Sequence, residues 1–227
     1  MELEVHLHQT AESADAHGDL DSEVAKLMDD TISRWSGVTP NISTKSEASD
    51  APSEETKSSG SGYFCLNTYI DWDWKPGLVE WWMYYMENTD CIDQTAADSN
   101  ILITNGPGNA PGGWAYGGQY AVVELGPCTN PDWYYDGSCI NNDYQFRFAM
   151  NAVHEMGHNI KMDHPDGRID ENRDGTGEET PMTNFYGDNA IKEDWEMNCD
   201  EAIPSTEPSD WYTQNEFTKC KKDSSYL

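Results

Sequence analysis

Hydrophobic and polar residues alternate over residues 3–9, and this period of two predicts a strand with one buried face. Over residues 19–35 the apolar positions instead recur at helical spacing, which predicts an amphipathic helix. Residues 40–62 then contain few hydrophobic residues and are rich in Ser, Thr, Glu, Lys and Gly. We therefore expect a surface loop or a mobile segment there.

Further regular patterns follow along the chain. The apolar run at 78–86 comes after Pro76, a residue favoured in the first turn of a helix, and predicts a short second helix. Residues 100–104 and 119–125 have the apolar composition of buried strands. A glycine-rich turn is expected between them, at 106–118.

A third helix is expected to begin at a cap formed by Asp143. Its apolar face comprises Phe146, Ala149, Val153, Met156 and Ile160. Beyond residue 165 we expect a loop-rich region with short helices near 189–197 and 209–219. This order of elements predicts an α/β arrangement in which a mixed sheet is packed by two or three helices.

Composition allows one sizeable domain with a real core, because 37% of the 227 residues are apolar. Charge is the outlier: 42 Asp and Glu against 13 Lys and Arg give a formal net charge of -29. Nucleic acid and anionic membrane surfaces attract basic proteins, so neither is an expected partner. The acidity fits either a surface adapted to high salt or an acidic secreted protein that prefers cationic substrates.

Six cysteines at wide spacing, none in a CxxC pair, favour three disulfides and an oxidising compartment. The alternative is six reduced thiols. Pairing of neighbours would join Cys65 to Cys91, Cys128 to Cys139 and Cys199 to Cys220. The first residues lack the basic-then-apolar run of a secretory signal, so a secreted form is expected to have lost its targeting segment. No apolar stretch is long enough to span a membrane.

Candidate chemistry is concentrated in residues 154–164, which read His-Glu-Met-Gly-His-Asn-Ile-Lys-Met-Asp-His. His154 and His158 stand four residues apart, so on a helix both can occupy corners of one zinc tetrahedron. Glu155 is adjacent and can activate water without binding zinc. His164 can return as a third ligand if the helix stops. The fourth position then stays open for water, as catalytic zinc requires.

Chance is a poor explanation for this spacing, because the chain has only six histidines and three of them lie in this segment. An HExxH motif alone is moderate evidence, whereas a third histidine at this offset makes the signal strong. The remaining three, His6, His8 and His17, show no such spacing. We expect them to be ordinary strand and loop residues.

The segment resembles the metzincin consensus HExxHxxGxxHxx, and HEMGHN followed by an apolar residue and Met-x-His is similar to the adamalysin (reprolysin, ADAM-type) branch. The resemblance implies a mixed, mostly parallel twisted sheet with an active-site helix. It also implies a small irregular C-terminal subdomain, which would divide the chain into residues 1–164 and 165–227. A methionine-containing turn is implied beneath the zinc, and Met182 is the candidate for it.

Three positions depart from that branch. Lys161 stands where the family has a glycine, and a left-handed conformation at a residue with a side chain costs about 1 kcal/mol. Pro165 replaces an acidic residue, with Asp166 one place later. The turn reads Thr-Pro-Met where adamalysins tend to have Cys-Ile-Met. The clan is therefore better supported than the branch.

These residues predict a secreted zinc-dependent endopeptidase that cleaves protein or peptide substrates, with Glu155 as the general base. We expect a monomer, with a pro-segment or an inhibitor as a further partner. The edge strand around 119–125 would hold an extended substrate by strand addition. Two alternatives are a metal-dependent endoribonuclease with the motif HxxxHxxxxxH and an inactive metal-binding module. Glu155 argues against both, and the charge would repel RNA.

A candidate calcium loop follows the zinc motif. Asp170, Asn172, Asp174 and the glycine after them match the start of an EF-hand-like loop. The twelfth position is Pro181 where an EF-hand has Glu. A solvated acidic loop is therefore the preferred interpretation, and calcium is a second candidate cofactor.

Overall fold

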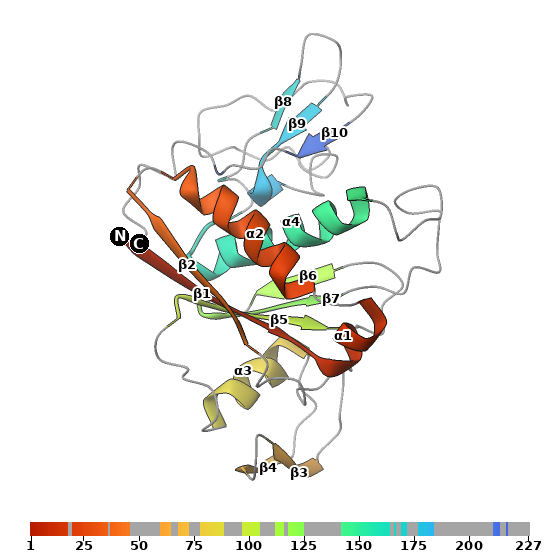
Figure 1. Ribbon diagram of the computed structural model, residues 1–227. Helices are drawn as coiled ribbons and strands as arrows, with labels where there is room; N and C mark the ends of the chain where they lie inside the picture. Colours follow the sequence, from red (N-terminus) through yellow and green to blue (C-terminus); the bar gives the residue numbers. More distant parts are fainter. Residues whose placement is uncertain are drawn as a thin grey trace.

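Figure 1 shows the computed structural model of the protein. The structure describes residues 1–17, 20–35, 37–45, 60–64, 68–72, 78–88, 97–104, 112–115, 118–124, 142–163, 166, 169–171, 177–183, 211–213 and 217.

The centre of the molecule is a five-stranded sheet in the order β2-β1-β5-β7-β6. Its strands are β1 (Glu2–Gln9), β2 (Thr39–Lys45), β5 (Ser99–Thr104), β6 (Gly112–Ala115) and β7 (Tyr120–Glu124). Four strands run parallel, and β6 runs antiparallel to β7. The predicted mixed sheet is therefore present, and the strands expected at 3–9, 100–104 and 119–125 are confirmed.

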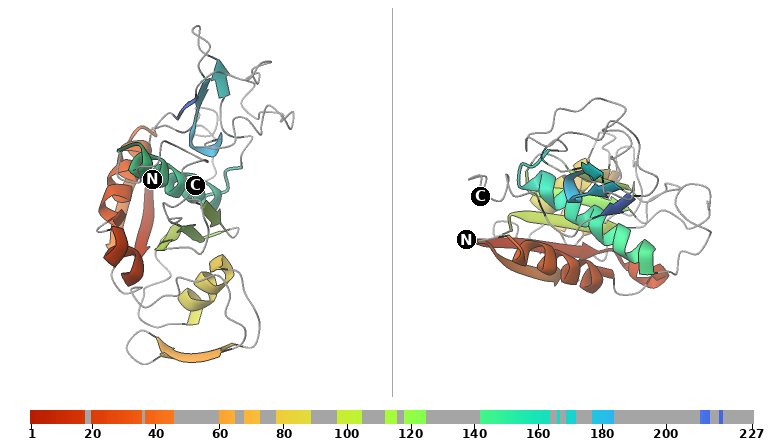
Figure 2. Two further views of the ribbon diagram at one scale, coloured as in Figure 1. Left: turned by 90° about the vertical axis from the view of Figure 1, so that its right-hand side faces the viewer. Right: turned by 90° about the horizontal axis from the view of Figure 1, so that it is seen from above.

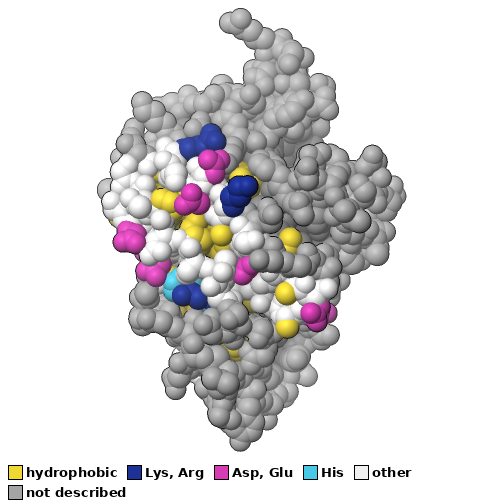
Figure 3. All heavy atoms as spheres, viewed as in Figure 1, with side chains coloured by type: hydrophobic (Ala, Val, Ile, Leu, Met, Phe, Trp, Pro, Cys, Tyr) yellow, Lys and Arg dark blue, Asp and Glu magenta, His cyan; other side chains and the backbone are white. Residues whose placement is uncertain are grey.

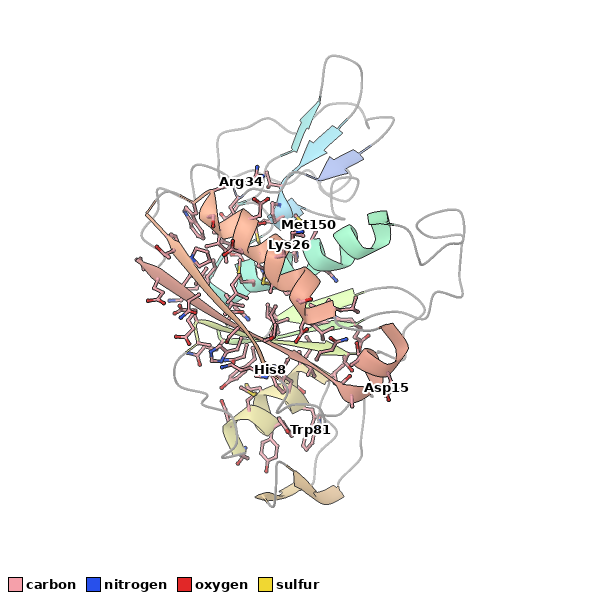
Figure 4. All side chains as sticks on the ribbon, viewed as in Figure 1. His8, Asp15, Lys26, Arg34, Trp81 and Met150 are labelled. Atoms are coloured by element: carbon pink, nitrogen blue, oxygen red, sulfur yellow. The ribbon has the colours of Figure 1, made fainter. Side chains whose placement is uncertain are left out.

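Helices cover both faces of this sheet (Figures 1 and 2). α2 (Leu20–Ser33) and α4 (Asn142–Asn159) pack on one face, and α3 (Leu78–Asn88) packs on the other. Figure 4 shows Met150 and Lys26 on the α2 and α4 side and Trp81 on the α3 side. Two covering layers explain why β5 and β7 are buried at nearly every position. The helices expected at 19–35 and 78–86 are confirmed.

Alternation along β1 divides its side chains between the two layers. Leu3, Val5 and Leu7 are fully buried in the core against α2 and α4. On the opposite face, His8 is fully buried and lies edge-on to Trp82 of α3, with ring centroids 5.0 Å apart. The prediction that His6 and His8 are strand residues is confirmed.

Two predictions in the N-terminal region are wrong. Residues 11–17 form α1 (Ala11–His17), so His17 belongs to a helix and not to a loop. The Thr10 hydroxyl accepts a hydrogen bond from the Ser13 amide at 3.2 Å and caps this helix. Residues 39–45 form β2, not a loop. A polar sequence is tolerated there because β2 is a partly exposed edge strand.

Short strands account for the other differences. β3 (Gly60–Phe64) pairs with β4 (Thr68–Trp72), and β8 (Ile169–Glu171), β9 (Gly177–Glu179) and β10 (Trp211–Thr213) form a three-stranded sheet. β3 replaces part of the expected loop at 40–62, β6 part of the expected turn at 106–118, and β10 part of the helix expected near 209–219. These strands are only three to five residues long, too short to show a clear period.

Several predictions lie outside the described residues, namely the helix near 189–197 and all six cysteines. Within the described part of the chain, no helix is both long and apolar enough to cross a membrane. On the face seen in Figure 3, acidic side chains separate the Lys and Arg side chains that the structure describes, and these form no broad basic patch.

Candidate metal centre

Helix α4 carries the histidine motif and is anchored to the sheet by its apolar face. Val153, Met156 and Ile160 are buried in the core, as the helical spacing predicts. At its C-terminal end, the Asn159 amide donates to the Ser99 hydroxyl of β5 at 2.7 Å. The helix begins at residue 142, so Asp143 lies within its first turn and not at the expected cap position.

The helix ends in a Schellman motif at the position where the metzincin consensus has glycine. Lys161 adopts a left-handed backbone conformation with φ of 69°. Its amide donates to the His158 carbonyl at 2.9 Å, and the Met162 amide donates to the Gly157 carbonyl at 2.9 Å. The left-handed conformation considered for this position is therefore present, with a lysine in place of the glycine.

The two helical histidines face each other across one turn of α4. Their Nε2 atoms are 3.1 Å apart, and their ring planes are almost perpendicular, at 87°. His154 is buried, with 2% of its surface exposed, whereas His158 is partly exposed. The solvent-exposed part of the pair therefore belongs to His158.

Backbone carbonyls hold both rings by their other nitrogen. His154 Nδ1 lies 2.6 Å from the Pro181 carbonyl oxygen, and His158 Nδ1 lies 2.8 Å from the Met162 carbonyl oxygen. A carbonyl oxygen only accepts hydrogen bonds, so each Nδ1 carries the proton. In the neutral rings both Nε2 atoms therefore present lone pairs to each other, which is a repulsive arrangement unless a cation or a proton lies between them.

Glu155 lies between α4 and the end strand of the sheet. Its side chain is only 4% exposed, and burial raises the pKa of this carboxyl to about 8. Gly113 of β6 lies directly against it, because a Cβ atom at this glycine would be 2.6 Å from Glu155 Oε1. The absence of a side chain at Gly113 therefore leaves room for the Glu155 carboxyl group. The sequence pattern did not single out this glycine.

Met182 lies in the 3-10 turn η3 (Pro181–Thr183), against the opposite side of α4. It is 1% exposed, and a Cβ atom at Gly157 would overlap its sulfur atom. The preceding residue, Pro181, supplies the carbonyl that holds His154. The candidate methionine turn and the histidine helix are thus in direct contact at two points.

The third predicted ligand, His164, lies outside the described residues. On either side of it, the Asp163 amide donates to Asp166 Oδ2 at 2.8 Å, and Asp166 is buried. Among the residues that the structure does describe, no three His, Cys, Asp or Glu side chains form a complete metal-binding group.

Of the three candidate calcium ligands, only Asp170 is among the described residues. Asp170 lies in β8, opposite Glu178 of β9, so the segment begins in an antiparallel pair of strands and not after a helix. Asn172 and Asp174 lie outside the described residues.

The segment 119–125, which we expected to be an edge strand that binds substrate, is not at the edge of the sheet. β7, which covers most of 119–125, lies between β5 and β6, so both of its edges are already paired. β6 is the end strand on this side of the sheet, and it carries Gly113 beside Glu155. The sequence pattern did not predict β6, because its four residues lie within a glycine-rich stretch. Its pairing partner β7 is close to it in the sequence.

Comparison with known proteins adds no relative to this picture. No family model matches the chain, and no curated protein is significantly similar to it in sequence.

Proposed function

We propose that this protein is a zinc-dependent endopeptidase with a metzincin-like fold, in which His154 and His158 hold the metal and Glu155 is the general base. The observation that carries the proposal is the convergence of two Nε2 lone pairs, 3.1 Å apart, with both Nδ1 protons committed to backbone carbonyls. Histidines that bind metals are commonly oriented in this way by a hydrogen bond from the second ring nitrogen.

The donor set suits zinc. Two nitrogen ligands at about 2.0–2.1 Å from a tetrahedral zinc ion are about 3.3 Å apart, close to the separation of this pair. His164 is the proposed third ligand, from the sequence motif. With three histidine ligands, a tetrahedral zinc ion would keep a fourth position for a reactant, which is the property that distinguishes a catalytic from a structural zinc site.

Zinc, when bound, supplies Lewis-acid chemistry by polarising the scissile carbonyl and making water easier to deprotonate. The chain's own residues provide the rest. Glu155 accepts a proton from the attacking water and returns it to the leaving amine. Its burial keeps the transferred proton from bulk solvent.

Substrate binding is assigned to the outer edge of β6. An extended peptide can add to an end strand through backbone hydrogen bonds. Because Gly113 has no side chain, the peptide backbone can lie close to Glu155. The subdomain boundary near residue 164, secretion and a monomeric state remain parts of the same proposal.

The decisive experiment compares Glu155→Gln with the parent protein. We expect the variant to retain zinc at an unchanged stoichiometry and to lose about 10²- to 10⁴-fold in peptidase activity, the usual contribution of a general base. The zinc content is measured by elemental analysis. Peptidase activity is measured with a denatured protein as the substrate. Glu2→Gln, an exposed glutamate in β1, is the matched control and should behave as the parent.

His158→Ala should in turn lose the zinc. An undiminished rate for Glu155→Gln would remove Glu155 from the base role. RNA is included as a second substrate, so chelator-sensitive cleavage of RNA alone would favour the endoribonuclease alternative.

A further inference from the structure

Next to Gly113, the end strand of the sheet carries an exposed tryptophan. Trp114 is 47% exposed, and apart from Met1 it is the only exposed large hydrophobic side chain that we find among the described residues. An exposed tryptophan ring offers a large apolar face to a ligand that lies along this strand, and it can also bind a cation.

Strand register places this ring on the α3 side of the sheet. Trp114 is paired with Val122 of β7, and Tyr120 lies two residues before Val122 on the same face. Diagonal neighbours across two antiparallel strands are about 7–8 Å apart, within reach of aromatic side chains. Trp114 and Tyr120 therefore lie on the same face of the sheet at this edge, as diagonal neighbours.

Tyr120 packs against the buried side chains of α3, and Glu87 lies in the last turn of that helix. Burial, and after it the charge of Glu87, raise the pKa of the Tyr120 hydroxyl, so Glu87 is close enough to act on it electrostatically. Glu87 is itself exposed. Two aromatic rings and an accessible carboxylate favour a cation, and the net charge of -29 adds to the attraction.

We propose that Trp114, Tyr120 and Glu87 form a subsite that selects a Lys or Arg side chain of the peptide substrate. This inference rests on the proposed function, because the peptide is the one that adds to β6. In such a peptide, the residue opposite Trp114 is the immediate neighbour of the residue opposite Gly113. The selected basic side chain therefore lies next to the part of the substrate that faces Glu155.

The test uses peptide pairs that are identical except for Arg or norleucine at one position, with that position moved along the peptide. The parent protein should prefer Arg at one position beside the cleaved bond. Trp114→Ala should lower the Arg-to-norleucine ratio of kcat/KM about two- to fivefold, the size of a cation–π contact at an exposed site. Glu87→Gln should lower the ratio and weaken its dependence on salt.

Binding is measured in parallel by fluorescence anisotropy with labelled peptides. The Glu155→Gln protein and its Trp114→Ala double variant are used, so that cleavage is too slow to disturb the binding measurement. Glu2→Gln, which removes one charge far from this edge, is the control and should leave the ratio unchanged.

Failure of the two proposals is distinguishable. If the parent cleaves peptides but Trp114→Ala leaves both ratios unchanged, the subsite is wrong and the peptidase proposal stands. If no peptide is cleaved, the peptidase proposal fails, and the binding ratio alone decides whether the edge selects a basic side chain. A loss of preference in Glu2→Gln equal to that in Glu87→Gln would also overturn the subsite.

Discussion

Lys161 shows how a single residue ends the helix that carries the histidines. Its left-handed conformation directs the chain so that the Met162 carbonyl accepts the His158 Nδ1 proton. A side chain in this conformation costs about 1 kcal/mol, which glycine avoids. The turn is thus needed for the orientation of a proposed ligand, whereas the lysine side chain, which is exposed, is not.

Lys161→Gly should therefore stabilise the protein. We expect the free energy of unfolding to rise by up to about 1 kcal/mol, because relief of the left-handed strain exceeds the added chain entropy of glycine. Urea denaturation measures the change. Lys161→Ala removes the same side chain but keeps Cβ and is the matched control; equal stabilities of the two variants would contradict this explanation.

Glu155 and Gly113 show a contact between two residues that are far apart in the sequence. No local pattern predicts that a glycine more than forty positions earlier in the chain lies against the candidate base. The contact arises because β6 pairs antiparallel with β7 and α4 packs on both strands. A side chain at residue 113 would displace the carboxylate that the proposed chemistry needs.

At the scale of elements, α4 is held between the sheet and the turn η3. Gly157 allows the close approach of η3, because a methyl group there would overlap the Met182 sulfur. Pro181 of the same turn fixes His154 through its carbonyl. The position of η3 and the orientation of a proposed metal ligand are therefore coupled.

A double-mutant cycle on this contact should show that coupling. Gly157→Ala alone is expected to destabilise the protein by about 1–3 kcal/mol, since overpacking outweighs the better helix propensity of alanine. In a Met182→Ala background the methyl group has room, so the same substitution should be neutral or stabilising. Chemical denaturation of the four proteins gives the interaction energy, and additive effects would mean that the two residues do not touch.

At the scale of the whole molecule, one buried histidine makes the free energy of unfolding depend on pH. His8 lies in the layer against α3, and burial lowers the pKa of its imidazole from 6.5 to about 3. The hydrogen bond with Asn100 raises this pKa, whereas the charges of His6 and Lys45 lower it further. In the unfolded chain this histidine titrates near 6.5. Between these values the unfolded state binds more protons than the folded state, so stability falls as pH decreases from 6.5 towards 3.

His8→Gln should make this decline shallower. The parent is expected to lose up to about 1.4 kcal/mol per pH unit from this group within the window, and the variant should lack that contribution. Above pH 7 both side chains are neutral, so the two proteins should differ by a constant amount. Urea denaturation at several pH values provides the measurement, and parallel curves between pH 6.5 and pH 4 would exclude His8 as a source of the acid sensitivity.

Local spacing along the chain determined a large part of this protein. The period of two in β1, the helical period in α2 and the apolar faces of α3 and α4 each follow from residues within one element. The relation of His154, Glu155 and His158 is of the same kind, because helix geometry alone places residues four apart on one face.

Tertiary structure decided what depends on contacts between elements. Whether a polar segment such as β2 becomes a strand depends on the edge it meets, and the end position of β6 depends on the order of pairing. The carbonyls of Pro181 and Met162, the gap left by Gly113 and the exposure of Trp114 belong to this group. Hydrogen bonding and packing join atoms that are close in space, whereas a sequence pattern reports only the order of residues along the chain.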